Sequence, residues 1–301
     1  MKKRASARLK PKNFNTKITK VTKYFDWFVF VVFVPFVFAF QTPPRRIISL
    51  VPALTEMLYA IGAGPQVIAV SSYDEYPPEV KTLPRVGALL DPDTERIIAL
   101  KPDLVITYGS QVDLQAQMKR AGLPTFDYRH GGLAHILLTI TELGRLTGQA
   151  AAAGKVVGTI EARLAAVRAG AAGKQRPKTL LVFSREPKTL RNMYVSGGRG
   201  FLHDMLEMAG GDNVFNAVDR ESVQVSTETI LAHAPEVIIE LRPENIPEGQ
   251  PMRDELAAWS RLASVPAVRN QRVHFIAGQA VTVPGPRVAD SVERMARALH
   301  P

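Results

Sequence analysis

The stretch GKVVGTIEARLAAVRAGAAG, residues 154–173, decides the fold because it separates two halves of similar pattern. It closes a segment, from Gly132 to Gly173, that is rich in alanine and has hardly any turn residues. Its apolar residues recur at helical spacing, so a single long helix fits this segment better than a loop. We place the linking helix itself at residues 147–173.

Short β-branched runs alternate with helical patterns on both sides of this helix. RRIISLVP (residues 45–52) has the pattern of a strand, and the helical pattern of TEMLYAIGAG follows it. The alternation restarts with TLLVFSRE at residue 179. Such alternation predicts parallel sheets covered by helices. The predicted class is therefore α/β, with two Rossmann-like lobes at residues 45–146 and 177–301 joined by one long rigid helix.

The N-terminal segment has the pattern of an export signal. Residues 1–44 carry nine Lys and Arg against one acidic residue, a net +8 of the whole chain's +10. They include the apolar stretch WFVFVVFVPFVFAF (residues 27–40), which is shorter than the roughly 20 residues of a membrane-spanning helix. We expect export to the periplasm with cleavage after Ala39. An uncleaved anchor at residues 1–40 is the alternative.

The rest of the chain is close to neutral and has no cysteine. Its charge therefore gives no reason to expect a nucleic-acid partner. Without cysteine there is no residue for a disulfide, a thiolate metal site, an iron–sulfur cluster or a lipid-modified N-terminus. A protein of the periplasm needs none of these.

Residues that follow the predicted strands are the candidates for ligand binding. Ligands of open α/β sheets bind outside the carboxyl ends of the strands, and two such sheets joined by one helix leave a cleft between them. In the first lobe these positions hold Pro52, Tyr73, Tyr108 and His130. Aromatic side chains suit a large flat ligand because they give much apolar contact at little cost in rotamer entropy. For each tyrosine, packing at the lobe surface is the alternative.

His130 raises the question of a metal. An imidazole can ligate a metal ion, but a single histidine in a loop favours a solvated side chain. His135 follows five residues later with no carboxylate between the two, which is not the spacing of a helical metal site. We therefore predict no metal site and keep ligation by His130 as the alternative.

The second lobe contributes its own candidates. Arg185 follows a strand and would suit amide carbonyls, a phosphate or carboxylates on the rim of a ligand. Tyr194 ends the next strand, and Gln279 lies in a loop where its amide could reach the cleft. The glycines of SGGRGF, residues 196–201, open a helix and could seat an anion on backbone amides. A tight strand-to-helix turn is the alternative for that segment.

Five segments resemble one family in the same order. The set is similar to the periplasmic binding proteins for cobalamin, ferric siderophores and haem, the helical-backbone class III family whose two Rossmann-like lobes are bridged by a rigid helix. Three pieces, VPALTE, SSYDEYPP and ERIIALKPDLV, are most similar to the cobalamin-binding branch. The five segments are RRIISLVPALTEMLYAIGAG, SSYDEYPPEV, LPRVGALLDPDTERIIALKPDLVITYGS, SGGRGFLHDMLEMAGGDNVF and VSTETILAHAPEVIIEL.

The resemblance implies a function and partners. The chain would be the periplasmic solute-binding component of an ABC importer, with no cofactor of its own and cobalamin as its transported ligand. It would deliver this ligand to a permease and ATPase complex, and a ferric siderophore or haem is the alternative ligand. Each lobe of the family presents a surface carboxylate to arginines of the permease, and by position these carboxylates are Glu95 and Glu228. Support of their own helices through the helix dipole is the alternative role.

Two other classes of function are weighed against transport. An exported metallo-enzyme would need clustered His, Asp and Glu side chains at metal-ligand spacing, and the sequence offers no such constellation. We therefore predict that the chain is not an enzyme. A membrane-tethered sensor with the same fold would be favoured by an uncleaved leader.

Overall fold

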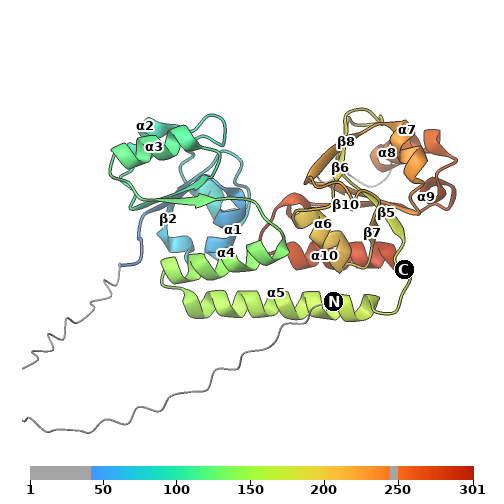
Figure 1. Cartoon of the computed structure of the whole chain (residues 1–301). Coiled ribbons are helices and arrows are strands. Elements are labelled where there is room, and N and C mark those ends of the chain that lie inside the picture. Colours follow the sequence, from blue (N-terminus) through green and yellow to red (C-terminus); the bar gives the residue numbers. More distant parts are fainter. Residues whose placement is uncertain (1–41, 245–249) are drawn as a thin grey trace, which may run out of the picture. The chain divides into compact units, whose positions relative to one another are not determined.

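The first half is built around a parallel sheet with the strand order β2-β1-β3-β4 (Figure 1). The computed structural model describes residues 42–244 and 250–301, so the predicted leader lies outside the described residues. No helix in these two ranges is long and apolar enough to cross a membrane. The strands are β1 (Ile47–Ser49), β2 (Val67–Val70), β3 (Leu104–Tyr108) and β4 (Thr125–Tyr128).

Helices cover both faces of this sheet. Successive residues of a strand point to opposite faces, so Ile47 of β1 joins one apolar cluster and Ile48 joins another. Both side chains are fully buried, which accounts for the continuous apolar runs of these strands. The helices are α1 (Pro52–Ala60), α2 (Thr94–Ala99), α3 (Val112–Arg120) and α4 (Leu133–Leu146).

The second half differs from the first because its sheet is mixed. Its main strand order is β10-β9-β5-β6-β8; β7 pairs with β5 off this path. The strand β6 runs antiparallel to both β5 and β8. The loop from β5 to β6, residues 185–192, is too short for the crossover that a parallel pair requires. The strands are β5 (Lys178–Ser184), β6 (Met193–Ser196), β7 (Asp212–Asn213), β8 (Ser222–Val225), β9 (Val237–Arg242) and β10 (Val273–Ala277).

Five α-helices are described in the second half. The helix α7 begins after Ser226, whose hydroxyl accepts a hydrogen bond from the backbone N–H of Thr229 at 3.3 Å. The helix α10 was not predicted from the sequence, although its apolar residues lie on one buried face. The helices are α6 (Phe201–Met208), α7 (Thr227–His233), α8 (Gln250–Trp259), α9 (Pro266–Arg269) and α10 (Val288–Leu299).

Two helices, and not one, occupy residues 132–173. The helix α4 ends at Leu146, and α5 (Ala150–Ala171) begins four residues later. Between them Gly148 has a φ of 76°, which a helix cannot contain and which glycine adopts without steric cost. The prediction of a single long helix over this segment is therefore wrong. The helix α4 belongs to the first half and packs against α5, which alone leads into β5 (Figure 1).

One apolar cluster extends through both halves. The helix α5 packs against α4 of the first half and against α10 and α6 of the second. Leu143 of α4, Ile160 of α5 and Met295 of α10 are buried members of this cluster. Burial of each such side chain contributes roughly 1.5–3 kcal/mol. The halves are therefore joined by packing as well as by the chain, and residues 42–301 form one compact unit.

Gly144 is a point of close approach between α4 and α5. A Cβ atom placed on Gly144 would lie 2.3 Å from the Cβ of Ala153. We expect Gly144→Ala to lower the free energy of unfolding by about 1–3 kcal/mol, because the helices must move apart, even though alanine favours the helix.

Gly158→Ala in α5 is the matched control for this substitution. Nothing lies within 4 Å of its Cβ position, so we expect a gain of about 0.5–1 kcal/mol from helix propensity. Urea unfolding of both variants measures the difference. Equal stability of the two variants would contradict the close packing of α4 on α5.

Candidate functional site

An aromatic cluster lies at the carboxyl end of the first sheet. The parallel pairing of β3 with β4 places Tyr108 opposite Tyr128, and His130 follows two residues later. The ring centroid of His130 lies 5.5 Å from that of Tyr108 and 5.2 Å from that of Tyr128. These separations are within the range of favourable ring contacts. Tyr108 and His130, which were predicted separately, therefore belong to one cluster.

The environment of this cluster favours neutral side chains. Burial raises the pKa of Tyr128 to about 12 and also raises the pKa of Tyr108. His130 keeps an exposed surface, but the loss of water beside the rings lowers the pKa of its imidazole below the ordinary value. The carboxylate of Glu221 opposes this shift in the pKa of His130. At neutral pH the cluster therefore presents uncharged rings.

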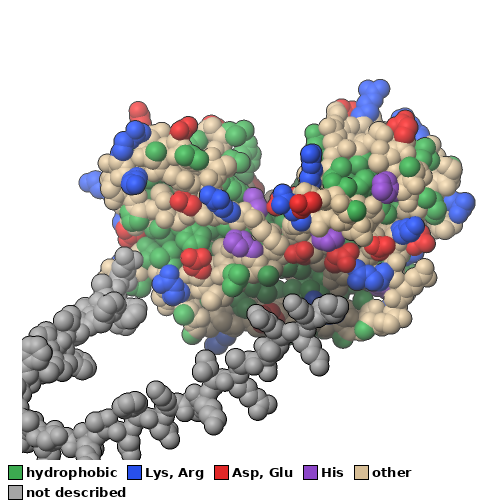
Figure 2. Space-filling view, viewed as in Figure 1, with side chains coloured by type: hydrophobic (Ala, Val, Ile, Leu, Met, Phe, Trp, Pro, Cys, Tyr) green, Lys and Arg blue, Asp and Glu red, His purple; other side chains and the backbone are tan. Residues whose placement is uncertain are grey.

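A cavity of about 240 Å³ adjoins His130 and is lined mainly by the second half. Phe183 of β5 and Phe201, the first residue of α6, supply its apolar wall. Figure 2 shows the surface hollowed between the two halves, with charged and histidine side chains at the floor of the hollow. We call this region the groove. The remaining residues that line its cavity are Arg199, Gly200, Leu202, Glu221, Ser222 and Thr282.

The other predicted ligand residues lie near the sheet ends but do not line the cavity. Tyr73 follows β2 and is 75% exposed, and Pro52 is the half-buried first residue of α1. Gln279 is exposed at the start of a short 3₁₀ helix, Gln279–Thr282. Tyr194 lies on β6 with its ring centroid 6.5 Å from that of Phe183. Of these four residues, only Tyr194 contacts a ring of the cavity wall.

Arg185 is inside the second half and not at the groove. Its side chain has no exposed surface, and its guanidinium lies 2.9 Å from the carboxylate of Glu240 and 2.6 Å from that of Glu255. Arg242 contacts the same two carboxylates, and the indole N–H of Trp259 donates to Glu240 at 2.9 Å. The prediction that Arg185 meets a ligand is therefore wrong. The two buried carboxylates need positive partners, and Arg185 supplies one of these positive charges.

The first two glycines of SGGRGF form a tight turn, and their backbone amides are already paired. The backbone N–H groups of Gly197 and Gly198 already donate to the carbonyl oxygens of Glu221 and Val218, at 3.2 and 2.8 Å. A Cβ atom on either glycine would lie about 2 Å from a carbonyl oxygen of residues 216–220. The glycines are therefore needed for close approach of two backbone segments.

Glu221 and Thr282 of the cavity were missed by the sequence analysis. Glu221 precedes β8, a short strand whose antiparallel pairing places Ser222 opposite Ser196 of β6. This pairing brings Glu221 beside the turn that carries Arg199. No local pattern marks a residue whose position depends on strand pairing across the sheet. Thr282 is the last residue of the short 3₁₀ helix that begins at Gln279, so the segment was predicted but not this residue.

Glu95 and Glu228 are exposed, each in the first turn of its helix. Asp93 caps α2 by accepting a hydrogen bond from the backbone N–H of Arg96 at 3.0 Å. In α7, hydrogen bonding to Ser226 lowers the pKa of Glu228. Figure 1 shows α2 and α7 on the side of the sheets away from α5. The two carboxylates thus belong to different halves and lie on the same side.

The described residues offer little for a resident metal. Within residues 42–244 and 250–301, no group of three or more His, Asp or Glu side chains is placed to hold a metal ion. His130 and His135 both lie beside Tyr128, and its ring centroid is 6.0 Å from that of His135. A metal that arrives within a ligand could therefore meet at most one imidazole at the cavity, that of His130.

Comparison with known sequences identifies the fold's relatives. Residues 47–280 match a family described as periplasmic binding protein. The chain is 29% identical to an uncharacterized ABC transporter substrate-binding lipoprotein of Bacillus subtilis, over 86% of this chain and 81% of the relative. It is 34% identical to the vitamin B12-binding protein of Salmonella typhimurium, over 64% of this chain and 71% of the relative.

Solved structures give the same result. A periplasmic vitamin B12 binding protein of Vibrio cholerae matches with a TM-score of 0.73 and 28% identity, covering 86% of this chain and 97% of that chain. A periplasmic heme-binding protein of Roseiflexus matches with a TM-score of 0.70 and 25% identity, covering 85% and 98%. Both are similar in fold over nearly all of their own length.

Removal of Arg185 tests the reassignment of this residue. We expect Arg185→Ala to reduce the free energy of unfolding by about 3–5 kcal/mol, because Glu240 and Glu255 lose a buried counter-charge. Arg199→Ala is the control, since this side chain is 60% exposed and pairs with Asp219 at 3.6 Å. Its loss should change stability by about 0–1 kcal/mol. Similar effects of the two substitutions in urea unfolding would refute the buried role of Arg185.

Proposed function

We propose that this chain, which belongs to the periplasmic binding protein family, is the solute-binding component of an ABC importer and carries cobalamin or a related corrinoid in the groove. The observation that carries the proposal is the meeting of rings from both halves, His130 from the first and Phe183 and Phe201 from the second, at one cavity. The chain works in the periplasm and passes its ligand to a permease and ATPase complex. It acts by binding and not by catalysis.

The chemistry of the groove suits a large flat ligand with polar edges. Neutral rings at its floor can contact the face of a macrocycle. Arg199 and Glu221 at the cavity can bind amide or phosphate groups at the edge of such a ligand. The enclosed volume is below the roughly 300–1,000 Å³ of common ligand pockets, so a corrinoid would use the cavity as a floor and extend into the open groove.

Relatives support the choice of ligand class. The Salmonella and Vibrio proteins are named for vitamin B12 binding, and the Roseiflexus protein is named for heme binding. Haem or a ferric siderophore is accordingly the second candidate. The neutral imidazole of His130 beside the cavity favours haem specifically, because a neutral imidazole nitrogen is a good ligand for iron.

A ligand panel tests the proposal. Cyanocobalamin, haemin and ferrichrome are added separately to the purified protein, and thermal unfolding and absorbance are recorded. Cobalamin at 100 times its dissociation constant should stabilise the folded state by about 2.7 kcal/mol. Phe183→Ala should weaken this effect because its ring lines the cavity. Phe126→Ala is the matched control, a half-buried phenylalanine on β4 that does not line the cavity.

The results of the ligand panel decide between the candidate ligands. A shift with haemin alone would replace cobalamin by haem. No shift with any of the three compounds, or equal weakening by both phenylalanine variants, would overturn the assignment of ligand to this groove.

We infer in addition that Glu95 and Glu228 meet basic residues of the permease. They are exposed carboxylates, one on each half, on the same side of the molecule (Figure 1). Charge reversal of both, Glu95→Lys with Glu228→Lys, should abolish cobalamin uptake while leaving cobalamin affinity unchanged, because neither residue lines the cavity. Uptake by cells and equilibrium binding by the purified protein measure the two properties.

Two other exposed acids provide the control for charge. Glu142→Lys with Glu161→Lys makes the same change in net charge on α4 and α5. This variant should transport as well as the parent. Loss of uptake in the control, or uptake that survives reversal at Glu95 and Glu228, would disprove the docking role.

A further inference from the structure

An ion pair crosses between the halves where α10 begins. Glu56 of α1 and Arg287, the residue before α10, are separated by 231 positions. The guanidinium donates from Nε to Oε2 of Glu56 at 2.9 Å and from Nη2 to Oε1 at 2.6 Å. Glu56 is only 5% exposed. A two-bond arginine–carboxylate pair fixes orientation as well as distance, so α1 and α10 are held in one relative position.

Arg287 also contacts the loop that carries Tyr73, one of the predicted ligand residues. Its guanidinium carbon lies 3.8 Å from the ring centroid of Tyr76, three residues after Tyr73. This loop is itself tightly held, since the buried carboxylate of Asp74 accepts hydrogen bonds from the backbone N–H of Ser71 at 3.0 Å and from its hydroxyl at 2.5 Å. Arg287 therefore lies between the first helix of one half and a rigid loop at the edge of its sheet.

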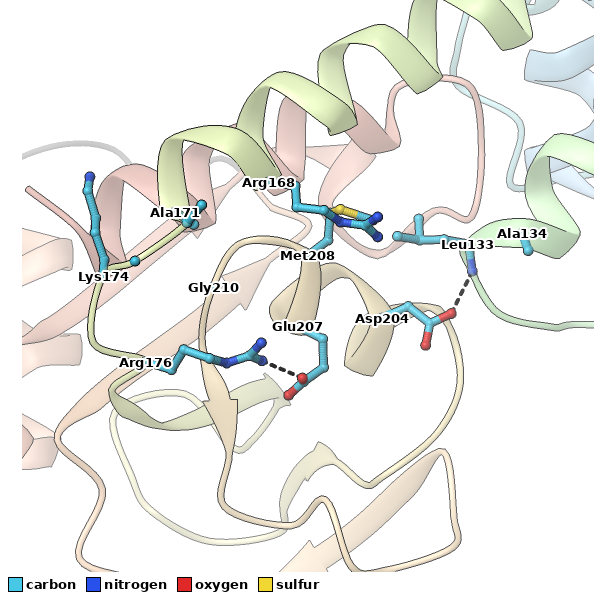
Figure 3. Close-up of a pocket in the computed structure, with 12 residues that line it drawn as sticks. Leu133, Ala134, Arg168, Ala171, Lys174, Arg176, Asp204, Glu207, Met208 and Gly210 are labelled. Atoms are coloured by element: carbon cyan, nitrogen blue, oxygen red, sulfur yellow. Dashed lines mark hydrogen bonds and ion pairs between the residues drawn. The ribbon is translucent and has the colours of Figure 1, made fainter.

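A second polar contact joins the halves at α4. Asp204 of α6 accepts a hydrogen bond from the backbone N–H of Leu133 at 2.8 Å (Figure 3). The residue before α4 is Gly132, which has no side chain to cap the helix, and a Cβ atom there would lie 2.1 Å from Oδ2 of Asp204. The second half thus caps a helix of the first. This contact lies in the wall of a separate hollow of about 660 Å³ beside the end of α5.

We propose that Arg287 is a positioning residue that sets the opening of the groove. It ties α1 and the loop of Tyr76 to the start of α10, and the Asp204 contact provides a second attachment at α4. With two attachments on different helices, the halves resist rotation that a single linking helix would allow. The groove is then preformed before any ligand arrives, which reduces the entropy lost on binding. This role holds for whichever ligand the groove takes.

The absence of cysteine makes the proposal directly testable. Spin labels are attached to cysteines introduced at Lys119 of α3 and Ala232 of α7, which are exposed and lie in different halves. Pulsed electron resonance then gives the distribution of distances between the labels without ligand, so the result does not depend on the proposed function. The parent should give one narrow distribution, and Arg287→Ala should broaden it toward longer distances.

Two further variants distinguish an effect on the relative position of the halves from an effect on the stability of the fold. Glu56→Met with Arg287→Met replaces the buried pair by apolar side chains, a change that is often neutral or stabilising for folding. This double variant should keep the parent's melting temperature and still broaden the distribution. Arg287→Lys keeps the charge but loses the two-bond geometry, and it should broaden the distribution less than Arg287→Ala.

Arg46→Ala is the control within one half. The side chain of Arg46 donates two hydrogen bonds, to the carbonyl oxygens of Leu100 and Lys101, both within the first half. Its removal should leave the distribution of distances unchanged. A folded double variant with the parent's distribution, or equal broadening by Arg46→Ala, would overturn the proposal.

Discussion

The packing of α5 against both α4 and α10 is the constraint on which the rest of the structure depends. It makes one apolar cluster out of two sheets that would otherwise have separate cores. Because protein interiors are close-packed, such a junction resists gradual deformation. The carboxyl ends of the two sheets are therefore held on either side of the groove. The fold alone forms this groove, without any contribution from a ligand.

The contents of the groove follow from strand order. Parallel strands β3 and β4 bring Tyr108, Tyr128 and His130 to one edge, where burial raises the pKa of both tyrosines and the loss of water lowers the pKa of His130. The opposite wall comes from β5 and the start of α6, where Phe183 and Phe201 are placed. The charged side chains that line the cavity are Arg199 and Glu221. A groove of this composition discriminates by shape and ring contact, which suits a macrocyclic ligand better than a small ion or sugar.

Local patterns were sufficient to predict the α/β class, most strands and the positions of Tyr108 and His130 after their strands, because ligand residues of a parallel sheet follow the strand ends. They failed where position depends on distant partners. Arg185 is drawn inside by carboxylates on β9 and α8, and Glu221 reaches the cavity through the pairing of β8 with β6. The single helix over residues 132–173 was wrong for a local reason, since glycine is tolerated within a helix and only the positive φ of Gly148 shows that one helix ends there.

Hydrogen exchange with and without saturating cobalamin tests the central claim most directly, that one preformed groove holds the ligand between two fixed halves. The account predicts slower exchange in loops of both halves, near residues 128–131 and 198–202, and unchanged exchange in α4, α5 and α10. Protection confined to one half would contradict it. So would altered exchange throughout α4, α5 and α10, because that would show that the junction itself opens when the ligand binds.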